Sequence, residues 1–372
     1  MARILILWNQ VDDDVYEHFR REGPRAVAWD PAVVVQPWET VQEEMDLIRR
    51  ALEGGGHEVT VVNVRDSFAT MQGAIAATAP DAIMNLVEFF KDDPEQEHHV
   101  PAVFELLGLA YTGNRPLSLS LCQKKPQAKA VLASMGVPTP RGITIEAGKA
   151  PRALDLQYPL MVKPAFDDAS GGIDADSVVH DRAGLDARVA RLLGENRQVA
   201  LVEEYIDGRE IHCAILADIP LPLYEMVFSD GLDERGKPLP RIITYRAKWD
   251  PYSREHHAVT PRCPVDDLSA AEVEKIQGVA LAAYHALGCR DYARVDMRMT
   301  SAGEVYVLEV NPNPDLADTC AFAKSAAAAG RSYDELIREI IALALARQGV
   351  AKPLASGFDQ LLNEYKAKQQ QR

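Results

Sequence analysis

The sequence predicts an α/β protein in which a parallel sheet with helices on its faces is followed by two smaller α+β units. Short apolar runs alternate with helical patterns over the first third of the chain, as in parallel sheets. Farther along, strand patterns follow one another across short turns. With 372 residues, the chain is also too long for one ordinary core, so two or three domains are expected.

The first unit is expected over residues 1–118. Three apolar strands alternate there with two helices that end in glycine. In chain order these segments are "RILILW", "ETVQEEMDLIRRALEGGG", "HEVTVVNV", "DAIMNLVE" and "VPAVFELLG". Gly54–Gly56 end a helix before a strand, whereas the glycines of a dinucleotide-binding site follow a strand and open a helix. A dinucleotide oxidoreductase is therefore disfavoured.

The second unit is expected over residues 119–212 and the third over 213–350. The second contains the helix "QKKPQAKAVLASMG", the strand "YPLMVKPA", a helix near 182–194, and two strands that meet at Asp207-Gly208. The third contains the helices "AAEVEKIQGVALAAYHALG" and "SYDELIREIIALALARQG" on either side of a strand pair. Residues 351–372 are expected to form a frayed polar tail.

Composition narrows the class of protein. Hydrophobic residues make up 47% of the chain and charged residues 26%, values typical of a globular protein in water. The net charge of −15 argues against nucleic acid or an anionic membrane as the main partner, and no apolar run is long enough to span a membrane. The five cysteines form no CxxC pair, which favours free thiols in a reducing cytoplasm over disulfides or a zinc site.

The strand pair in the third unit carries the first candidate site. "RVDMRM" and "EVYVLEVN" flank the turn "TSAG" and are expected to form a hairpin. Alternation along a strand puts Arg294, Asp296 and Arg298 on one face of the first strand. It likewise puts Glu309 and Asn311 on one face of the second. The spacing alone fits either a cation site or a solvated strand end beside a proline-rich turn.

The register of the hairpin decides whether these side chains meet. If Thr300 pairs with Val305, Asp296 lies directly opposite Glu309. A slip of one residue would place the two carboxylates on opposite faces. In the favourable register, oxygen-bearing side chains converge beside an arginine, which suggests Mg²⁺ holding phosphate oxygens.

Phosphate binding would also need cations, and three lysines are candidates. Lys163 ends an apolar strand just before "SGG" at 170–172, where glycines let backbone N–H groups approach phosphate oxygens. Lys125 precedes a helix, and Lys248 lies in "TYRAKWD". Each lysine taken alone is equally compatible with an ordinary solvated side chain.

The order of these motifs resembles that of the ATP-grasp ligases, and most closely the D-alanine–D-alanine ligase branch. The shared order is Lys125, "LMVKP" with its glycine-containing loop, "VEEYIDGRE", "RAKW", "ARVD" and "LEVNPNP". "AYTGNRPLSLSLCQKKPQAK", "GVPTP" and "GCRDYARVDMRM" resemble that branch in particular, and the match extends over about residues 81–346. The resemblance implies the ATP-grasp fold, in which two α+β subdomains clamp ATP behind an N-terminal parallel-sheet domain.

The resemblance also implies roles for individual residues. Two Mg²⁺ ions, with Mn²⁺ as an alternative, would be held by Asp296, Glu309 and Asn311. The implied ATP-binding residues are Lys125, Lys163, Ser170, Gly171, Gly172, Glu203, Glu204, Tyr205, Ile206, Glu210 and Lys248. The implied catalytic residues are Arg294, Lys248 and Ser170.

Ligation chemistry explains why these residue types belong together. A carboxylate is a poor electrophile and attacks the γ-phosphate of ATP to give an acyl-phosphate. Lysines and Mg²⁺ neutralise the transferring group, and an amine then attacks the activated carbonyl as phosphate leaves. Closure of the loop at 166–173 would keep water from this intermediate. The implied partners are small-molecule carboxylates and amines.

Several positions on the substrate side depart from the family pattern. The family's glutamate in a glycine-rich segment after the first strand has no clear equivalent in "WNQVDDDVYEHF". The family segment HGxxGEDG is replaced by "EFFKDDPEQEHH", whose His98 and His99 are expected to be solvated rather than to contact substrate. Ala169 replaces the first of two loop serines, and Trp249 replaces a tyrosine.

The region after the metal candidates departs further. Where the family has xxPGM and uses the glycine N–H in its oxyanion hole, this chain has "PNPDL" with Asp315. The charge of Asp315 disfavours an anionic acceptor and favours a cationic amine. Cys320 replaces the serine that would hold the acceptor's carboxylate, and no base marks it as a nucleophile. The expected function is an ATP-dependent carboxylate–amine ligase acting on amino-acid-like substrates other than two D-alanines.

Other functions stay open at the level of sequence. One is a D-alanine–D-alanine ligase proper, and another is an ATP-grasp enzyme that uses a thiol or ammonia as acceptor. A non-catalytic nucleotide-binding module is disfavoured because the metal and phosphate residues, which contribute little to stability, are retained. The resemblance further implies a homodimer in the cytoplasm.

Overall fold

The computed structural model describes residues 1–11, 23–91, 93–147, 155–195 and 199–347. The polar tail expected at 351–372 lies outside the described residues. In the part of the chain that is described, no helix is both long and apolar enough to cross a membrane.

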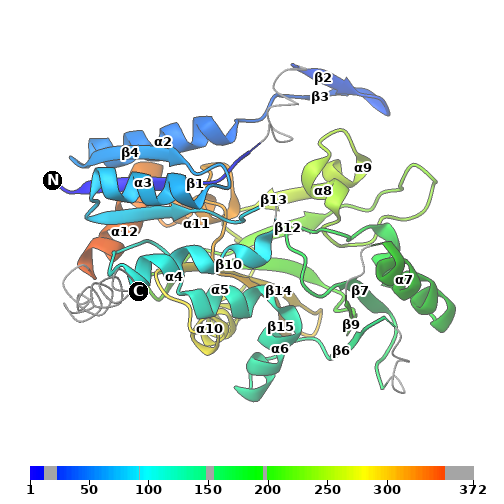
Figure 1. Cartoon of the computed structure of the whole chain (residues 1–372). Coiled ribbons are helices and arrows are strands. Elements are labelled where there is room, and N and C mark those ends of the chain that lie inside the picture. The colour runs from blue at the N-terminus through cyan, green and yellow to red at the C-terminus, as the bar shows by residue number, and fades with distance from the viewer. Residues whose placement is uncertain (12–22, 92, 148–154, 196–198, 348–372) are drawn as a thin grey trace.

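The N-terminal unit is built on three strands in the order β4-β1-β5 (Figure 1). Its elements are β1 (Arg3–Trp8), β2 (Arg25–Val27), β3 (Asp30–Val35), α2 (Val41–Gly54), β4 (Glu58–Asn63), α3 (Phe68–Thr78), β5 (Ala82–Leu86), the 3-10 helix η1 (Pro94–Gln96) and α4 (His99–Leu106). The predicted parallel sheet is confirmed, because β1 pairs in parallel with both β4 and β5. The β2–β3 hairpin and α3 were not predicted, since neither has a strongly periodic apolar face.

Helix α2 shows how the sequence sets both a boundary and a buried face. The Thr40 side chain accepts a hydrogen bond from the N–H of Glu43, and the Glu43 carboxylate accepts one from the N–H of Thr40. Met45, Ile48 and Leu52 then recur at helical spacing and are buried in the core of the N-terminal unit. The helix therefore begins at a capping box and covers one face of the sheet.

The second unit is a four-stranded sheet in the order β6-β9-β7-β8. Its elements are α5 (Pro116–Gln123), α6 (Lys125–Ser134), β6 (Gly142–Ile145), β7 (Leu160–Pro164), the 3-10 helix η2 (Ala175–Ser177), β8 (Val178–Val179), α7 (Arg182–Glu195) and β9 (Ala200–Glu204). Helix α7 covers this sheet with Leu185 and Leu192 in the shared core. The strand expected to carry Lys163 is β7.

The third unit is a larger sheet whose main path is β13-β12-β10-β14-β15. Its elements are β10 (Arg209–Leu216), β11 (Ile219–Pro220), β12 (Tyr224–Phe228), α8 (Tyr245–Trp249), α9 (Arg254–His257), β13 (Val259–Arg262), α10 (Ala270–Ala286), β14 (Tyr292–Met299), β15 (Val305–Asn311), α11 (Ala321–Ala328) and α12 (Tyr333–Ala346). Alternate residues such as Ile211, Val295 and Met297 pack with α10 in one core. The intervening side chains of β10 and β14 are largely polar and lie on the opposite face.

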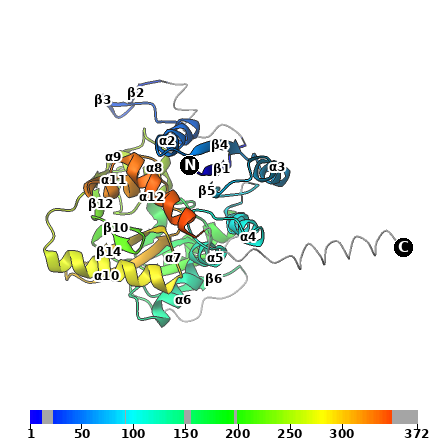
Figure 2. The ribbon, with the colours of Figure 1, turned by 90° about the vertical axis from the view of Figure 1, so that its left-hand side faces the viewer.

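The last helix completes the core of the first unit. Leu336 and Ile340 of α12 belong to the same buried cluster as Ile4 of β1 and the apolar face of α2. Arg338 Nε also donates a hydrogen bond to the carbonyl oxygen of Ala51 over 2.8 Å. Figures 1 and 2 both show α12, coloured orange to red, lying beside the blue N-terminal elements.

The β2–β3 hairpin connects the first unit to the third. Trp29, in the turn of the hairpin, donates a hydrogen bond from Nε1 to the carbonyl oxygen of Tyr252 over 2.9 Å. The guanidinium carbon of Arg254 lies 5.0 Å from the centre of the Trp29 ring. Trp38 also lies beside His256, with ring centres 5.9 Å apart. The N-terminal unit thereby contacts the segment that contains α8 and α9.

The turn at Asp207-Gly208 joins two consecutive strands as expected, but β9 and β10 belong to different sheets and do not form a hairpin. The boundary expected at residue 212 falls inside β10. We therefore propose that the second unit ends at this turn and that the first ends near residue 118. The α12 contacts described above mean that the three units share their cores in part.

Gly208 is expected to tolerate no side chain. Its φ is +150°, and an added Cβ would lie 2.1 Å from the carbonyl oxygen of Met299. We expect Gly208→Ala to destabilise the protein by about 2–3 kcal/mol because the two strands must move apart. Gly278→Ala is the control, since a Cβ there meets nothing within 4 Å and should stabilise α10 by about 0.5–1 kcal/mol. Thermal melting of the two variants with equal midpoints would contradict this expectation.

Candidate active site

The β14–β15 hairpin brings the expected metal-binding side chains together. Asp296 lies opposite Glu309, as predicted, although Met299 rather than Thr300 pairs with Val305. A β-bulge after Asp296 leaves Leu308 as an extra residue on β15, and this insertion compensates for the tighter turn. Leu308 and Glu309 consequently line the same cavity even though they are consecutive in the chain.

Polar side chains form rows across the face of the large sheet that α10 does not cover. The central row runs through His212 on β10, Asp296 on β14 and Glu309 on β15, which are successive partners in the ladder. Side chains two residues along each strand share the same face. The flanking rows therefore pair Glu210 with Arg298 and Arg294 with Asn311.

Asp296 is the most tightly held carboxylate of the central row, and it is 6% exposed. Arg294 donates to its two oxygens from Nε and Nη2 over 2.8 and 2.9 Å, and Asn311 Nδ2 donates to Oδ2 over 2.9 Å. Burial would raise the pKa of Asp296, but Arg294 and the neighbouring His212 outweigh burial and hold that pKa below its usual range. The carboxylate is therefore ionised, as binding of a cation requires.

A second buried charge cluster lies under the cavity. Glu203, which is 2% exposed, has carboxylate oxygens 2.7 Å from Lys129 Nζ and 2.9 Å from Lys163 Nζ. Burial opposes ionisation of Glu203, but the two ammonium groups outweigh it and lower its pKa. Burial also lowers the pKa of Lys129, whereas for Lys163 the charges of Glu203 and Glu309 outweigh burial and raise the pKa. Lys163 thus keeps its positive charge at the wall of the cavity.

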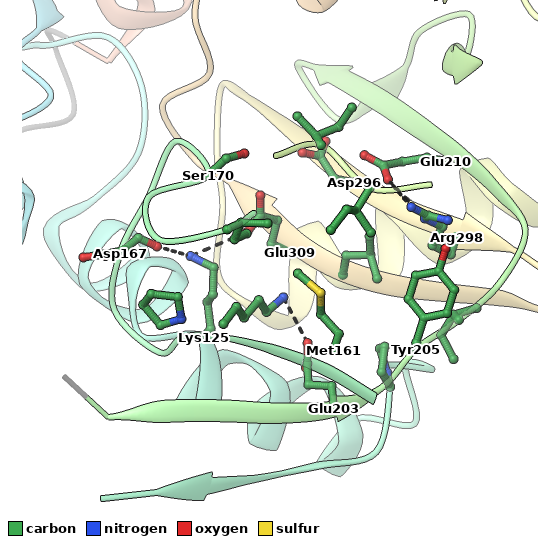
Figure 3. A pocket seen from close by; sticks show the side chains of 18 of the residues that line it. Lys125, Met161, Asp167, Ser170, Glu203, Tyr205, Glu210, Asp296, Arg298 and Glu309 are labelled. Atoms are coloured by element: carbon green, nitrogen blue, oxygen red, sulfur yellow. Dashed lines mark hydrogen bonds and ion pairs between the residues drawn. The ribbon is translucent and has the colours of Figure 1, made fainter. Parts of the chain in front are cut away.

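The loop at 166–173 is anchored from both sides. Lys125 Nζ donates to the carbonyl oxygen of Asp167 and lies 3.6 Å from a carboxylate oxygen of Glu309 (Figure 3). On the other side, Trp249 Nε1 donates to the carbonyl oxygen of Ala169 over 3.0 Å. Trp249, noted above as a departure from the family pattern, therefore holds the loop against α8.

A cavity lies between the two sheets, and most of the expected ATP and metal residues line it (Figure 3). Those lining residues are Lys125, Lys163, Ser170, Gly171, Glu203, Glu204, Tyr205, Ile206, Glu210, Asp296 and Glu309. Arg294 and Asn311 are not among the lining residues but contact Asp296. Gly172 continues the loop, and Lys248 lies on α8 with Nζ 5.0 Å from the centre of the Trp249 ring.

Apolar side chains line the part of the cavity beside the end of β9. Met161, Ile206 and Ile242 are among them. Beside them, Glu210 accepts two hydrogen bonds from Arg298, over 3.1 and 2.7 Å, so its carboxylate is fixed in place. The cavity therefore has an apolar end and a charged end.

Carboxyl groups gather near the loop and α8. Although part of its side chain is open to solvent, desolvation together with the charges of Asp315 and Asp168 raises the pKa of Glu88 to about 7, opposed by Lys248. Burial raises the pKa of Glu97 to about 8, and Glu88 adds to this effect. Over the described ranges of the chain, Glu88, Glu97 and Asp315 form no ion pair, and the charge of Lys248 offsets the repulsion at Glu88 only in part.

Cys320 and the histidine pair lie close to this acidic region. The Cys320 thiol donates to Asp315 Oδ2 over 3.1 Å, and burial together with that carboxylate raises the pKa of the thiol. The neutral thiol at pH 7 is a poor nucleophile. His98 and His99 follow Glu97 at the start of α4, with ring centres 4.1 Å apart; His98 is half-buried and His99 is exposed.

The metal candidates form an open set of ligands. In the residues that the structure describes, no three His, Cys, Asp or Glu side chains are arranged to hold a metal ion on their own. Mg²⁺ that accompanies a nucleotide needs only one or two carboxylates, because phosphate oxygens and water supply the other ligands. Asp296, Glu309 and Asn311 fit a shared site of that kind.

Comparison with known proteins gives the family of the chain. A family model described as "D-ala D-ala ligase C-terminus" matches residues 132–342, more than half of the sequence. The chain belongs to the D-alanine–D-alanine ligase family. The match covers β7, β9 and the β14–β15 hairpin, which supply most of the cavity wall.

Whole-chain relatives extend the ligase match into the N-terminal unit. The "uncharacterized protein y4sG" of Sinorhizobium fredii is 32% identical over 349 residues, covering 92% of this chain and 96% of its own length. A D-alanine–D-alanine ligase of Desulforudis audaxviator is 32% identical over 305 residues, covering 80% and 91% of the two chains. A Bacillus anthracis D-alanine–D-alanine ligase solved in complex with ATP superposes with a TM-score of 0.68 at 23% identity, covering 95% of this chain and all of that one. That superposition establishes the ATP-grasp fold.

The ligase cavity also contains residues that sequence reasoning missed. Lys129 lies four residues after Lys125 on the same helix, so helical spacing was an available signal for it. Arg298 shares the face of Asp296 by alternation, but its partner Glu210 is distant in sequence. The position of Leu308 depends on a bulge, for which the sequence carries no clear signal.

The stability of this ligase is expected to depend on pH through Glu97, which accepts a hydrogen bond from Asn313 Nδ2 over 2.9 Å. Its folded-state pKa of about 8 lies above the ordinary value of 4.5, so the folded protein binds the proton more tightly. Stability present in acid is therefore lost as the pH rises from about 4.5 to 8, by at most about 1.4 kcal/mol per pH unit.

Glu97→Gln removes this titration and keeps an acceptor for Asn313. We expect its melting temperature, relative to the unmodified protein, to rise steadily between pH 5 and pH 8.5. Glu95→Gln, at an exposed neighbouring position, is the control and should show a constant difference. A pH-independent difference for Glu97→Gln would show that this carboxyl group does not have a raised pKa.

Proposed function

We propose that this protein is an ATP-dependent ligase that joins a carboxylate to an amine through an acyl-phosphate, forming an amide or peptide bond. The observation that carries the proposal is that Lys125 and Lys163 meet the carboxylates of Asp296 and Glu309 in one cavity. Ammonium groups attract the phosphates of ATP, while adjacent carboxylates hold the divalent cation that accompanies them. Membership of the ligase family supports this reading.

The nucleotide would lie along the cavity between the two sheets. The adenine would lie at the apolar end among Met161, Ile206 and Ile242, near the backbone of Glu203–Ile206. Glu210 would bind the ribose hydroxyls, and Arg298 holds its carboxylate ready for them. No part of this arrangement requires a charged group to enter the apolar end.

The triphosphate would extend towards the charged end. Lys125 and Lys163 lie in the wall there, and the backbone of the loop at 170–172 offers N–H groups beside them. Lys248 would approach from α8 once the loop is closed. Asp296, Glu309 and Asn311 would hold two Mg²⁺ ions, or Mn²⁺ in their place. When bound, the cation neutralises negative charge on the transferring phosphoryl group.

The protein's own groups would then promote two displacements. A substrate carboxylate oxygen attacks the γ-phosphorus, and ADP leaves. The amine nitrogen next attacks the acyl carbon, phosphate leaves, and the amine loses a proton. Arg294, fixed by Asp296 with its side chain 20% exposed, would donate to the oxygen that gains charge in each step. Ser170 and the closed loop would exclude water from the acyl-phosphate.

The acidic region supports substrates other than two D-alanines. An acceptor D-alanine carries a free carboxylate, which Asp315 and its neighbours would repel. Nearby carboxylates contribute to the raised pKa values of Glu88 and Glu97. A cationic group that binds beside them would relieve that repulsion. We therefore infer small-molecule carboxylate and amine substrates, the amine being the cationic partner. A cytoplasmic homodimer completes the proposal.

Product analysis tests the proposal directly. We expect the protein, incubated with ATP, Mg²⁺ and pooled D- and L-amino acids, hydroxy acids and polyamines, to release ADP and phosphate with a condensed product visible by mass spectrometry. Glu309→Gln should lower the rate at least about 100-fold, because it weakens the hold on the cation that neutralises the transferring phosphoryl group. Glu304→Gln, an exposed position on the same hairpin, should retain the rate.

Each result separates the candidate functions. D-alanyl-D-alanine as the favoured product would identify a D-alanine–D-alanine ligase proper, and a thioester or a primary amide would identify a thiol or ammonia as acceptor. Tight ATP binding without turnover on any substrate would favour a non-catalytic binding module. Failure to bind ATP would overturn the proposal.

Asp315 is expected to set the charge preference of the acceptor. Asp315→Asn should raise KM for cadaverine or lysine relative to D-alanine by about tenfold, because a favourable charge interaction in a partly desolvated site is lost. Asp266→Asn, an exposed change away from the cavity, should leave the ratio unchanged. Competition between the two acceptors in one reaction gives the ratio directly, and an unaltered ratio for Asp315→Asn would exclude this role.

A further inference from the structure

His212 lies between the carboxylates of Glu210 and Asp296 on the polar face of the large sheet, and no role has been assigned to it above. It is 8% exposed and packs beside Tyr224, with ring centres 6.0 Å apart. Its Nε2 is 3.5 Å from Glu210 Oε1, and its Nδ1 is 3.8 Å from Asp296 Oδ1. The imidazole thus links the candidate ribose ligand to the candidate metal ligand.

Neither ring nitrogen of His212 has a hydrogen-bond partner in the described part of the chain. A neutral imidazole has one N–H and one lone pair, whereas both of its neighbours are acceptor-only carboxylates. One nitrogen can turn its proton to Glu210 or Asp296, but the lone pair of the other then faces a carboxylate across a buried gap. That arrangement is unfavourable unless a positive charge lies there, either a second proton on the ring or a metal ion between the nitrogen and the carboxylate.

The sheet ladder fixes which nitrogen faces the metal candidates. His212 and Glu309 are the two cross-strand neighbours of Asp296, one on each side. Directly opposed residues have Cβ atoms about 4.5–5.5 Å apart and project from the same face of the sheet, so the side chains of His212 and Glu309 flank that of Asp296. Nδ1 faces Asp296, and Nε2 faces Glu210, which is also held by Arg298. A carboxylate behind one ring nitrogen is the usual means of orienting a histidine ligand.

We propose that His212 Nδ1 is a ligand of the divalent cation that Asp296 holds, and that this nitrogen makes the site prefer Mn²⁺ to Mg²⁺. The inference rests on the proposed function and goes beyond it by naming a fourth protein ligand and the metal it selects. Carboxylate and amide oxygens suit Mg²⁺ and Mn²⁺ alike, whereas an imidazole nitrogen favours the transition metal. Nucleotide phosphates and water supply the remaining ligands.

Pulsed EPR of bound Mn²⁺ tests the ligand without relying on turnover. The protein would be prepared with ¹⁵N-histidine and with ordinary histidine, and each sample loaded with Mn²⁺ and a non-hydrolysable ATP analogue. We expect a nitrogen modulation that changes from the ¹⁴N to the ¹⁵N pattern with the histidine label. His212→Leu replaces the imidazole by an apolar side chain of similar bulk and should abolish the nitrogen modulation. Tyr224→Phe alters the ring packed beside His212 but removes no nitrogen, so it should retain the modulation.

Affinity gives the second measurement. Competition between Mn²⁺ and Mg²⁺ in the same complex should show His212→Leu losing about 10-fold or more in Mn²⁺ affinity, while Mg²⁺ affinity changes far less. A general disturbance of the cavity would weaken both ions equally and would overturn the inference. Absence of histidine modulation in the unmodified protein would also overturn it.

The design separates this inference from the function on which it rests. Nucleotide-dependent Mn²⁺ binding that Glu309→Gln removes, but that carries no histidine signal, would leave the ligase proposal standing and exclude His212 as a ligand. If Mn²⁺ and the analogue fail to bind together at all, both proposals are wrong.

Discussion

Burial of charge is the constraint on which the cavity depends. Glu203, Glu210 and Asp296 are all nearly inaccessible to water, and each is ionised only because cationic side chains contact or adjoin it. An unpaired charge in such a position would cost several kcal/mol, so these pairs form as units. These ion pairs fix the positions of the ammonium and guanidinium groups before any phosphate binds. Preorganisation of this kind lowers barriers in polar reactions.

Apolar and polar residues alternate along the strands of the large sheet, and this alternation places the charged side chains on one face. The face towards α10 is apolar, with Ile211, Val295 and Met297 in a continuous core. Because the period of a strand is two, the intervening residues have to emerge together on the other face. Packing of α10 against the apolar face therefore leaves the charged side chains of Glu210, Arg294, Asp296 and Arg298 on the face towards the smaller sheet.

The parts that sequence could predict are those with strong local periodicity or an ordered series of motifs. The parallel N-terminal sheet, α2 and the β14–β15 hairpin belong to this class. The ion pair of Lys129 with Glu203 could not be predicted, since it joins residues from different elements whose approach depends on tertiary packing. The bulge at Leu308 could not be predicted either. Asp296 lies opposite Glu309 because a turn that is one residue tighter than expected is compensated by the extra residue on β15.

The substrate side shows why motif order has limits. Trp249 departs from the family pattern, yet it makes a defined contact with the loop through Ala169. The segment around it is also contacted by Trp29 from the N-terminal hairpin, an element without any periodic signature. A changed residue can therefore mark a rebuilt contact rather than a lost one, and only the tertiary structure distinguishes the two cases.

The packing of α12 into the first core has a consequence for co-translational folding. The N-terminal sheet emerges first, but Leu336 and Ile340, which close its hydrophobic cluster, are among the last residues described. The nascent sheet must keep an uncovered apolar face until α12 has been translated, because domains otherwise fold in the order in which they are synthesised. Folding of the first unit is therefore tied to synthesis of α12, and a chain truncated before this helix would expose a surface prone to aggregation.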